Sequence, residues 1–486
     1  MTPGHTVRSL AAMLLLLAPS AAEGGRNLLE NGAFRRWKAG VPSAWQLGKG
    51  AGSDGGPRSS ISKAAAGGVV LRGDAATRHW QLLSQGFPVE EGMSYRIHFV
   101  ARARDLRREA GQFQSSYVGM AFFDAAGRRV LMQVRDVDRP SWSEDGLILK
   151  PPAQAVRGQA MIFLAKSGIL EVRQVEVAAL GPGDSFDILV EEMDRSYSYF
   201  HHRKIDWKRL TARHRRDARG ASTPEAFAAE IRKMLSRLED WHVFIDLPGG
   251  KRIPTWAPRV ERNHDHAALL PRLRDVRRIG AVGLVARTTE GFGYVRVDTL
   301  TGAPKKFEEL REAMEGVLDA PGLIIDLRSN GGGNEAHAQQ IAAIFTGKRL
   351  LYAKSLVRSG PDHNDFSRPR LRYIQPRRGK IYERPMVCLI GRGCMSSGEG
   401  FALMMKALPQ ATLVGQPTRG ASGNPQPLEL PNGVTVHYSR WVALEADGGL
   451  FEGRGIAPDI LVEHRGAGDP TFDAGIEALR KRLAGQ

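Results

Sequence analysis

The spacing of hydrophobic positions changes twice along the chain. Between residues 27 and 180, short runs such as "YRIHFVARA", "AMIFLAK" and "EVRQVEVAAL" alternate apolar and polar positions, and glycine, proline and aspartate turns separate them. This period of two predicts β-strands with one buried face. Several such strands in succession predict a β-sandwich or jelly roll over residues 26–181.

A short break at "LGPGDS" ends the alternation, and apolar residues then recur at helical spacing. The runs "FDILVEEMDRSYSYF" and "TPEAFAAEIRKMLSRLED" both show this spacing, and Thr223 before Pro224 and Glu225 is a typical helix start. The sequence therefore predicts a helical subdomain over residues 186–247.

Downstream, apolar strands alternate with helical runs. "GAVGLVART", "GLIIDLRSN" and "MVCLIGRG" read as buried strands, and "FEELREAMEGVL" and "NEAHAQQIAAIF" as helices. This alternation predicts an α/β core with a largely parallel, covered sheet over residues 278–465, followed by a helix over residues 470–486. The fold class is therefore multidomain, and 486 residues at 42% hydrophobic content can form more than one core.

The N-terminal 22 residues carry a single arginine, the apolar run "LAAMLLLLA" and the small-residue segment "PSAA". This pattern predicts a secretory signal peptide over residues 1–22 and an exported protein, periplasmic or secreted. No later segment is long and apolar enough to predict a membrane span. The net charge of +17 is scattered rather than clustered, so a nucleic-acid partner is not expected.

Only two cysteines occur, Cys388 and Cys394. Two buried thiols are expected, although export would permit one bridge between them. No His-Glu-x-x-His helix or cysteine cluster predicts a metal, and "GGGNE" lacks the lysine of a phosphate loop. Neither a metal nor an organic cofactor is therefore expected.

Two small-residue turns carry the candidate chemistry. "GRGCMSSGEGF" follows an apolar strand and opens a helix, where a serine can either act as nucleophile or simply cap the helix. The hydrolase pattern Gly-x-Ser-x-Gly does not fit it. In "GLIIDLRSNGGGNEA" three glycines follow a buried strand, and their N–H groups can stabilise an oxyanion.

Taken in order with "VGQPTRG" and "FEGRGIAPDI", these turns resemble the tail-specific, C-terminal-processing proteases of serine peptidase family S41, over residues 185–463. The resemblance implies an α/β core of the ClpP/crotonase type. It also implies that the nucleophile is Ser396, three residues before Glu399. The oxyanion hole would then comprise the N–H of Ser397 with Gly331 or Gly332.

One branch of that family uses a lysine base soon after "GxPTxG", but this chain has Ala421 at that place. The chain instead resembles the tricorn-like branch, whose base is a histidine in a Leu-x-Asp-x-His pattern. Here "LEDWHVFI" supplies His242, and Glu452 in "FEGRGIAPD" would orient the imidazole. Trp241 stands where tricorn-type cores place a relay serine, and the chain between His242 and the core is too short for a PDZ domain.

The N-terminal run "NLLENGAFRRWKAGVPSAWQL" resembles carbohydrate-binding jelly rolls of the galactose-binding type. Trp37, Trp45 and Trp80 would then either stack on sugar rings or fill the sandwich core. The leading prediction is an exported serine peptidase that cleaves unfolded protein tails or peptides through an acyl-enzyme. The alternative is a non-catalytic protein that binds peptide or glycan on a peptidase fold.

Overall fold

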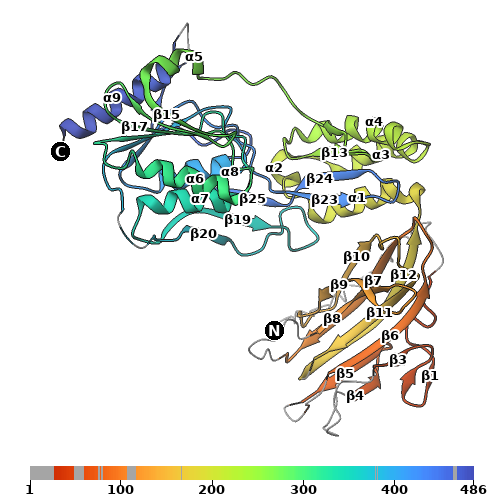
Figure 1. The fold of residues 1–486 in the computed structure, drawn as a ribbon. Coiled ribbons are helices and arrows are strands. Elements are labelled where there is room, and N and C mark those ends of the chain that lie inside the picture. The colour runs from red at the N-terminus through yellow and green to blue at the C-terminus, as the bar shows by residue number, and fades with distance from the viewer. Residues whose placement is uncertain are drawn as a thin grey trace, which may run out of the picture. The chain divides into compact units, whose positions relative to one another are not determined.

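The computed structural model describes residues 27–48, 60–74, 77, 80–106, 116–165, 167–377, 379, 381–463 and 468–485. The signal peptide predicted for residues 1–22 lies outside the described residues. The chain divides into two compact units, Met1–Ser185 and Phe186–Gln486 (Figure 1).

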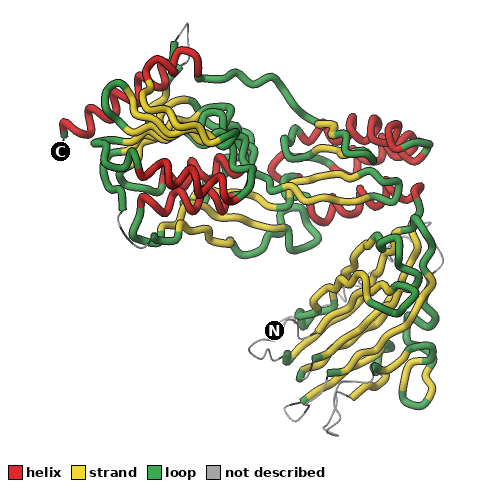
Figure 2. The backbone as a smooth tube through the Cα atoms, viewed as in Figure 1, coloured by secondary structure: helices red, strands yellow, loops and turns green. Residues whose placement is uncertain are grey.

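The first unit is a β-sandwich. Its described strands form two five-stranded antiparallel sheets, ordered β10-β7-β12-β5-β4 and β3-β6-β11-β8-β9, and a small β1-β2 hairpin (Figure 2). The elements are β1 (Trp37–Lys38), β2 (Val41–Pro42), β3 (Gln46–Leu47), β4 (Ser60–Lys63), β5 (Val69–Gly73), β6 (Gln81–Pro88), β7 (Ser94–Arg104), β8 (Ser116–Phe123), β9 (Arg129–Asp136), β10 (Ser143–Leu149), β11 (Arg157–Leu164), β12 (Gly168–Leu180) and η1 (Pro182–Asp184).

Alternating side chains of both sheets fill the sandwich core. Ile97 and Phe99 of β7 point inward and are almost fully buried, and each such side chain stabilises the fold by about 1.5–3 kcal/mol. In β12 the inward set changes phase, because the register shifts between Val172 and Gln174. This bulge lets Val172 and Val175, three positions apart, both enter the core.

The three tryptophans of the first unit differ in exposure. Trp45 is 5% exposed and packs on Phe34 with ring centroids 5.1 Å apart, so it belongs to the core. Trp37 and Trp80 are partly exposed. The structure thus removes Trp45 from the surface and leaves two of the three residues accessible from solvent.

The second unit mixes helices and sheets. Its elements are α1 (Ser185–Ser196), α2 (Phe200–Arg203), α3 (Trp207–Arg219), α4 (Pro224–Leu235), η2 (Ser236–Leu238), β13 (Phe244–Asp246), β14 (Arg252–Pro254), α5 (His266–Leu269), η3 (Leu270–Arg272), β15 (Leu273–Ile279), β16 (Gly283–Thr288), β17 (Gly293–Val297), α6 (Pro304–Glu315), β18 (Leu323–Asp326), α7 (Glu335–Ala342), η4 (Ala343–Phe345), β19 (Leu350–Val357), β20 (Arg370–Ile374), β21 (Met386–Ile390), α8 (Ser397–Lys406), β22 (Ala411–Gly415), β23 (Pro425–Glu429), β24 (Thr435–Ser439), β25 (Trp441–Glu445), β26 (Ile460–Leu461) and α9 (Pro470–Ala484).

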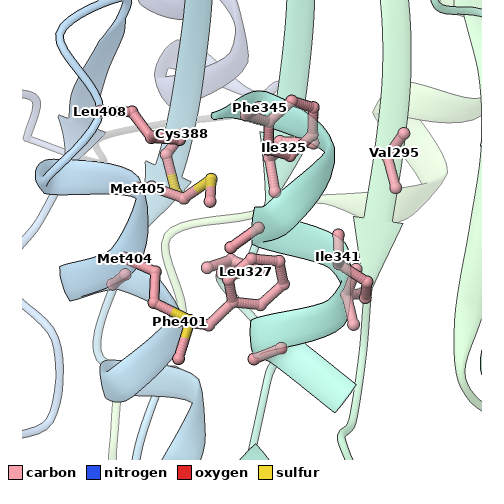
Figure 3. Close-up of a cluster of buried hydrophobic side chains, with 14 of the residues drawn as sticks. Val295, Ile325, Leu327, Ile341, Phe345, Cys388, Phe401, Met404, Met405 and Leu408 are labelled. Carbon is pink, nitrogen blue, oxygen red and sulfur yellow. The ribbon is translucent and has the colours of Figure 1, made fainter. Parts of the chain in front are cut away.

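The main sheet of this unit has the order β15-β16-β17-β18-β21-β22-β26 in the described part of the chain. The pairs from β17 to β26 are parallel, and β15, β16 and β17 pair antiparallel. Alternate residues face opposite sides. Ile325 and Cys388 lie in the same buried cluster as side chains of α6, α7 and α8, and Figure 3 shows those of α7 and α8. Ile324 and Val387 pack against α9.

A second, four-stranded sheet joins the helical segment to the core. β13 pairs with β14 and with β24, which in turn pairs with β23. Residues 244–254 therefore share a sheet with residues 425–439, a pairing that the hydrophobic pattern did not predict. A three-stranded sheet, β20-β19-β25, lies against α8.

Cys388 and Cys394 are both free and buried, in agreement with the first of the two expectations. Burial raises the pKa of each thiol well above its usual value. Within the described ranges, no helix is long and apolar enough to cross a membrane.

Candidate active site

Ser396 occupies a sharp turn between β21 and α8. Its backbone has φ 56° and ψ −128°, a region that favours glycine and that other residues adopt only under strain. The turn is held because the Ser396 N–H donates to the Ala421 carbonyl at 2.7 Å. The Ser396 hydroxyl makes no helix-capping hydrogen bond, so the capping alternative is wrong for this serine.

The Ser396 hydroxyl faces His242. The distance from Oγ to Nε2 of the imidazole is 3.0 Å, which is hydrogen-bonding range for a nucleophile and its base. His242 lies between η2 and β13 and is 5% exposed. Its own N–H donates to Asp240 Oδ1 at 2.8 Å, so the aspartate of the Leu-x-Asp-x-His pattern fixes the backbone that carries the ring.

Glu399 anchors the nucleophile turn from one helical turn further on. Its buried carboxylate accepts hydrogen bonds from the Thr418 hydroxyl at 2.6 Å and from the N–H groups of Gly420 and Ala421 at 2.6 and 2.8 Å. The same segment supplies the carbonyl that holds the N–H of Ser396. Glu399 therefore ties the 418–421 loop to the start of α8.

Glu452 lies near the histidine but does not reach it. Among the described residues, no hydrogen bond joins the Glu452 carboxylate to the imidazole. Oε1 accepts from Arg203 Nη2 at 2.7 Å, and Oε2 accepts from the N–H and the hydroxyl of Ser422 at 3.0 and 3.1 Å. Ser422 thus contacts Glu452, and the residue after it, Gly423, contacts His242. No sequence motif indicates Ser422.

The N–H of Gly423, the residue after Ser422, determines which nitrogen of the neutral His242 ring carries the hydrogen. Gly423 N–H donates to His242 Nδ1 at 3.3 Å, so Nδ1 acts as an acceptor and the neutral ring carries its proton on Nε2. In this arrangement Nε2 donates to Ser396. The opposite tautomer, which can accept the serine proton, needs a hydrogen-bond acceptor beside Nδ1.

The glycine loop lies directly against the nucleophile turn. A Cβ on Gly332 would stand 2.7 Å from Ser396 Cβ and 3.0 Å from the Ser397 nitrogen, so only glycine fits there. The Gly332 N–H already donates to Asn330 Oδ1 at 2.9 Å. In the described part of the chain, the N–H groups of Gly331 and Ser397 make no hydrogen bond with the protein, so these two predicted donors are free.

A buried ion-pair network fixes the strand end from which this loop starts. The fully buried guanidinium of Arg328 donates to Asp326 Oδ2 at 2.7 Å and to Asp469 Oδ1 at 2.6 Å. Arg328 also holds the pKa of Asp326 well below its usual range, although burial acts in the opposite direction. The charges are therefore paired, as buried charges must be.

Trp241 takes no part in a relay between the glutamate and the histidine. Its ring packs against Trp256, with centroids 6.1 Å apart, and under the guanidinium of Arg419 at 4.5 Å. An indole can donate a hydrogen bond but cannot accept one. Trp241 therefore contributes packing next to His242 in the chain and no relay hydroxyl.

Burial changes the ionisation of the groups around Ser396. It lowers the pKa of His242, and the nearby Asp240 carboxylate partly opposes this effect. It raises the pKa of Glu452 to about 8, with the Asp240 charge acting in the same direction and Arg203 in the opposite one. It also raises the pKa of Glu399 to about 7, against the hydrogen bonds that favour its charged form.

A cleft of about 470 Å³ opens beside the serine. The residues around it are Gly333, Asn334, Glu335, Arg372, Ser396, Ser397, Gly400, Leu403, Ser422, Asn424, Pro425, Trp441, Ala443 and Phe451. A peptide that enters this cleft meets the Ser396 hydroxyl. The described residues contain no group of three or more side chains suited to hold a metal ion.

The fold and this arrangement of serine, histidine and glycine loop fit a serine-type peptidase. Known proteins agree. The chain is 29% identical over 147 residues to the tricorn protease of Thermoplasma volcanium, covering 29% of this chain and 12% of that protein. It is 25% identical over 198 residues to a carboxy-terminal-processing protease of Bartonella bacilliformis, covering 39% of this chain and 43% of that protein.

The model of peptidase family S41 matches residues 291–462 of this chain. Among solved structures, a candidate peptidase from Parabacteroides merdae is similar with a TM-score of 0.54 and 26% identity, over 62% of this chain and 96% of that one. The chain spans less than half of the length of the two curated relatives above. The resemblance to this family is thereby confirmed, whereas the jelly-roll assignment of the first unit stays a prediction.

Proposed function

We propose that this chain is an exported serine peptidase that hydrolyses peptide bonds in unfolded protein tails or peptides, with Ser396 as nucleophile and His242 as base. The single observation that carries the proposal is the 3.0 Å contact between Ser396 Oγ and His242 Nε2, made by a serine on a strained turn. A serine hydroxyl is a weak nucleophile unless a base takes its proton.

In the proposed first step, Ser396 Oγ attacks the carbonyl carbon of the scissile peptide while its proton passes to His242 Nε2. Negative charge develops on the carbonyl oxygen, and the free N–H groups of Ser397 and Gly331 stabilise it. The imidazolium then gives its proton to the leaving amine. In the second step His242 takes a proton from water, and the water oxygen attacks the acyl carbon. Ser396 Oγ then leaves and receives the proton from His242.

Glu452 would act through Ser422. For Nε2 to accept the serine proton, Nδ1 must carry the ring hydrogen and the Gly423 N–H must turn away from it. The neighbouring Ser422 hydroxyl donates to Glu452 Oε2, so its oxygen retains lone pairs to accept Nδ1–H. Glu452 would then offset the imidazolium charge through one intervening hydroxyl.

The contact of Gly423 N–H with His242 Nδ1 also favours a second function, a non-catalytic protein that binds peptide or glycan. If that arrangement persisted with substrate bound, the ring could not take the serine proton. The partly exposed Trp37 and Trp80 are the side chains that support glycan binding by the first unit.

The test is labelling of the full chain with a fluorophosphonate probe, followed by mass spectrometry of the modified peptide. We expect rapid labelling on Ser396 and loss of both labelling and peptide hydrolysis in Ser396→Ala. The matched control, Ser397→Ala, should still label, because its proposed role uses only the backbone N–H. A folded wild-type chain that neither labels nor cleaves peptides would favour the binding protein.

A further inference from the structure

One ion pair borders the cleft beside Ser396 and has no part in the steps above. Arg372 Nη2 and Glu335 Oε2 form this pair, and both side chains line the cleft. A Cβ on Gly400 would lie 3.1 Å from Glu335 Oε1 and 3.5 Å from Arg372 Nη2. Because Gly400 is four residues after Ser396, which immediately precedes α8, the pair lies roughly 6 Å along the helix axis from the nucleophile.

The pair is held rigidly. The Tyr352 hydroxyl donates to Glu335 Oε1 and in turn accepts from Gln339 Nε2 at 3.1 Å. The guanidinium of Arg372 lies 4.8 Å from the Trp441 ring centroid and 5.3 Å from that of Tyr352. The side chains of Arg372 and Glu335 are only 12% and 19% exposed, so a group bound against them is largely shielded from water.

Arg372 retains unused donors. A guanidinium has five N–H groups, and Nη2 serves Glu335. In the part of the chain that the structure describes, Glu335 and the Tyr352 hydroxyl are the side chains that hydrogen-bond this guanidinium, so several of its N–H groups remain for a substrate. Each Glu335 oxygen already accepts one hydrogen bond, Oε1 from Tyr352 and Oε2 from Arg372. The pair therefore offers a substrate hydrogen-bond donors more readily than acceptors, with no net charge.

Part of the wall is apolar, with Leu403, Phe451, Ala443 and the Trp441 ring on the cleft, and Asn334, Ser422 and Asn424 are polar residues that also line it. We propose that this cleft takes a neutral substrate side chain that ends in a carbonyl oxygen, such as glutamine, and that the Glu335–Arg372 pair determines this specificity. A methylene stem would lie on the apolar wall while the carboxamide oxygen accepts from Arg372. The negative charge of Glu335 would repel a substrate carboxylate, and the positive charge of Arg372 would repel a substrate ammonium group.

This inference rests on the proposed peptidase function. The test measures kcat/KM of the full chain on peptides that differ at one position, with glutamine, leucine, glutamate or lysine on either side of the scissile bond. We expect glutamine to exceed leucine, and to exceed glutamate and lysine by about tenfold or more on one side of that bond. Equal rates for neutral and charged residues at both positions would overturn the proposal.

Two variants test the pair itself. Glu335→Gln leaves an unpaired cation, so the glutamate peptide should gain about tenfold relative to the glutamine peptide. Arg372→Met leaves an unpaired carboxylate, so the lysine peptide should gain instead. The matched controls Glu315→Gln and Arg377→Met remove a 3.2 Å pair outside this cleft and should keep the wild-type ranking.

The outcomes separate the two proposals. If no peptide is cleaved and the fluorophosphonate probe does not label Ser396, the peptidase function fails. If peptides are cleaved but both variants keep the wild-type ranking, only the specificity of the ion pair is refuted. If a variant fails to fold, the wild-type comparison of glutamine with glutamate and lysine still decides.

Discussion

The strained backbone of Ser396 makes an unusual prediction about stability. Its φ of 56° with ψ of −128° is the geometry at the first central position of a type II′ turn, which glycine adopts freely. Such a conformation costs a residue with a Cβ about 1–3 kcal/mol. Ser396→Ala keeps the Cβ and the strain, whereas Ser396→Gly removes both, and neither variant has the hydroxyl.

Glycine also loses more backbone entropy on folding, about 0.5–1 kcal/mol relative to alanine. The strain relief exceeds this entropy cost, so the free energy of unfolding of Ser396→Gly should exceed that of Ser396→Ala by up to about 2.5 kcal/mol. At Ser397, the first residue of α8, the order should be reversed, because a helical position gives glycine no compensating relief. The neighbouring residue thus provides a matched control with the same pair of substitutions.

Scanning calorimetry of the full chain is the suitable assay, because it can resolve the transition of the second unit from that of the first. A difference of 1 kcal/mol corresponds to a Tm shift of about 2 °C for a unit of this size. If Ser396→Gly melts at or below Ser396→Ala while the Ser397 pair behaves as expected, the turn is not strained and the reasoning fails.

Four further predictions concern activity and domain structure. Ser397→Ala should keep most of the peptide hydrolysis, as measured by kcat/KM, and a loss equal to that of the nucleophile variant would show that the wrong serine was chosen. Because burial lowers the pKa of His242, kcat/KM should rise with pH through a value below about 6.5. His242→Ala should remove this rise together with nearly all activity, and the control Lys406→Ala should preserve both. Because the pKa of Glu452 is raised to about 8, its charged form becomes the major one above that pH. A second rise of kcat/KM near pH 8 should therefore be present in the wild type and absent in a folded but slower Glu452→Gln. A fragment of residues 23–185 should fold alone, with a cooperative melt by circular dichroism as the check and an unfolded spectrum as the contrary result.

Much of the architecture followed from local patterns. The alternation in "YRIHFVARA" became β7, and the apolar runs before the glycines and before the two serines became β18 and β21. The contact of Ser396 with His242 joins positions whose local motifs were both recognisable. Periodicity and turn chemistry determine such features within a few residues.

Other features depend on contacts between distant segments. No local signal shows that residues 244–254 pair with residues 425–439, because strand partners are set by tertiary packing. The same limit applies to Ser422, because its proposed role depends on its hydrogen bond to Glu452, thirty positions away in the sequence. It applies as well to Gly332, where the N–H that a glycine-rich loop offers is already taken by the Asn330 side chain.

The base and the nucleophile come from segments 154 positions apart. His242 precedes a three-residue strand, β13, whose place depends on β24, whereas Ser396 is built into the central sheet and α8. Short peripheral elements open locally at lower free energy than a central sheet does. Mild denaturant should therefore abolish turnover while most amide protons of the central sheet remain protected from exchange. Turnover then reports on the integrity of β13 and not on global unfolding.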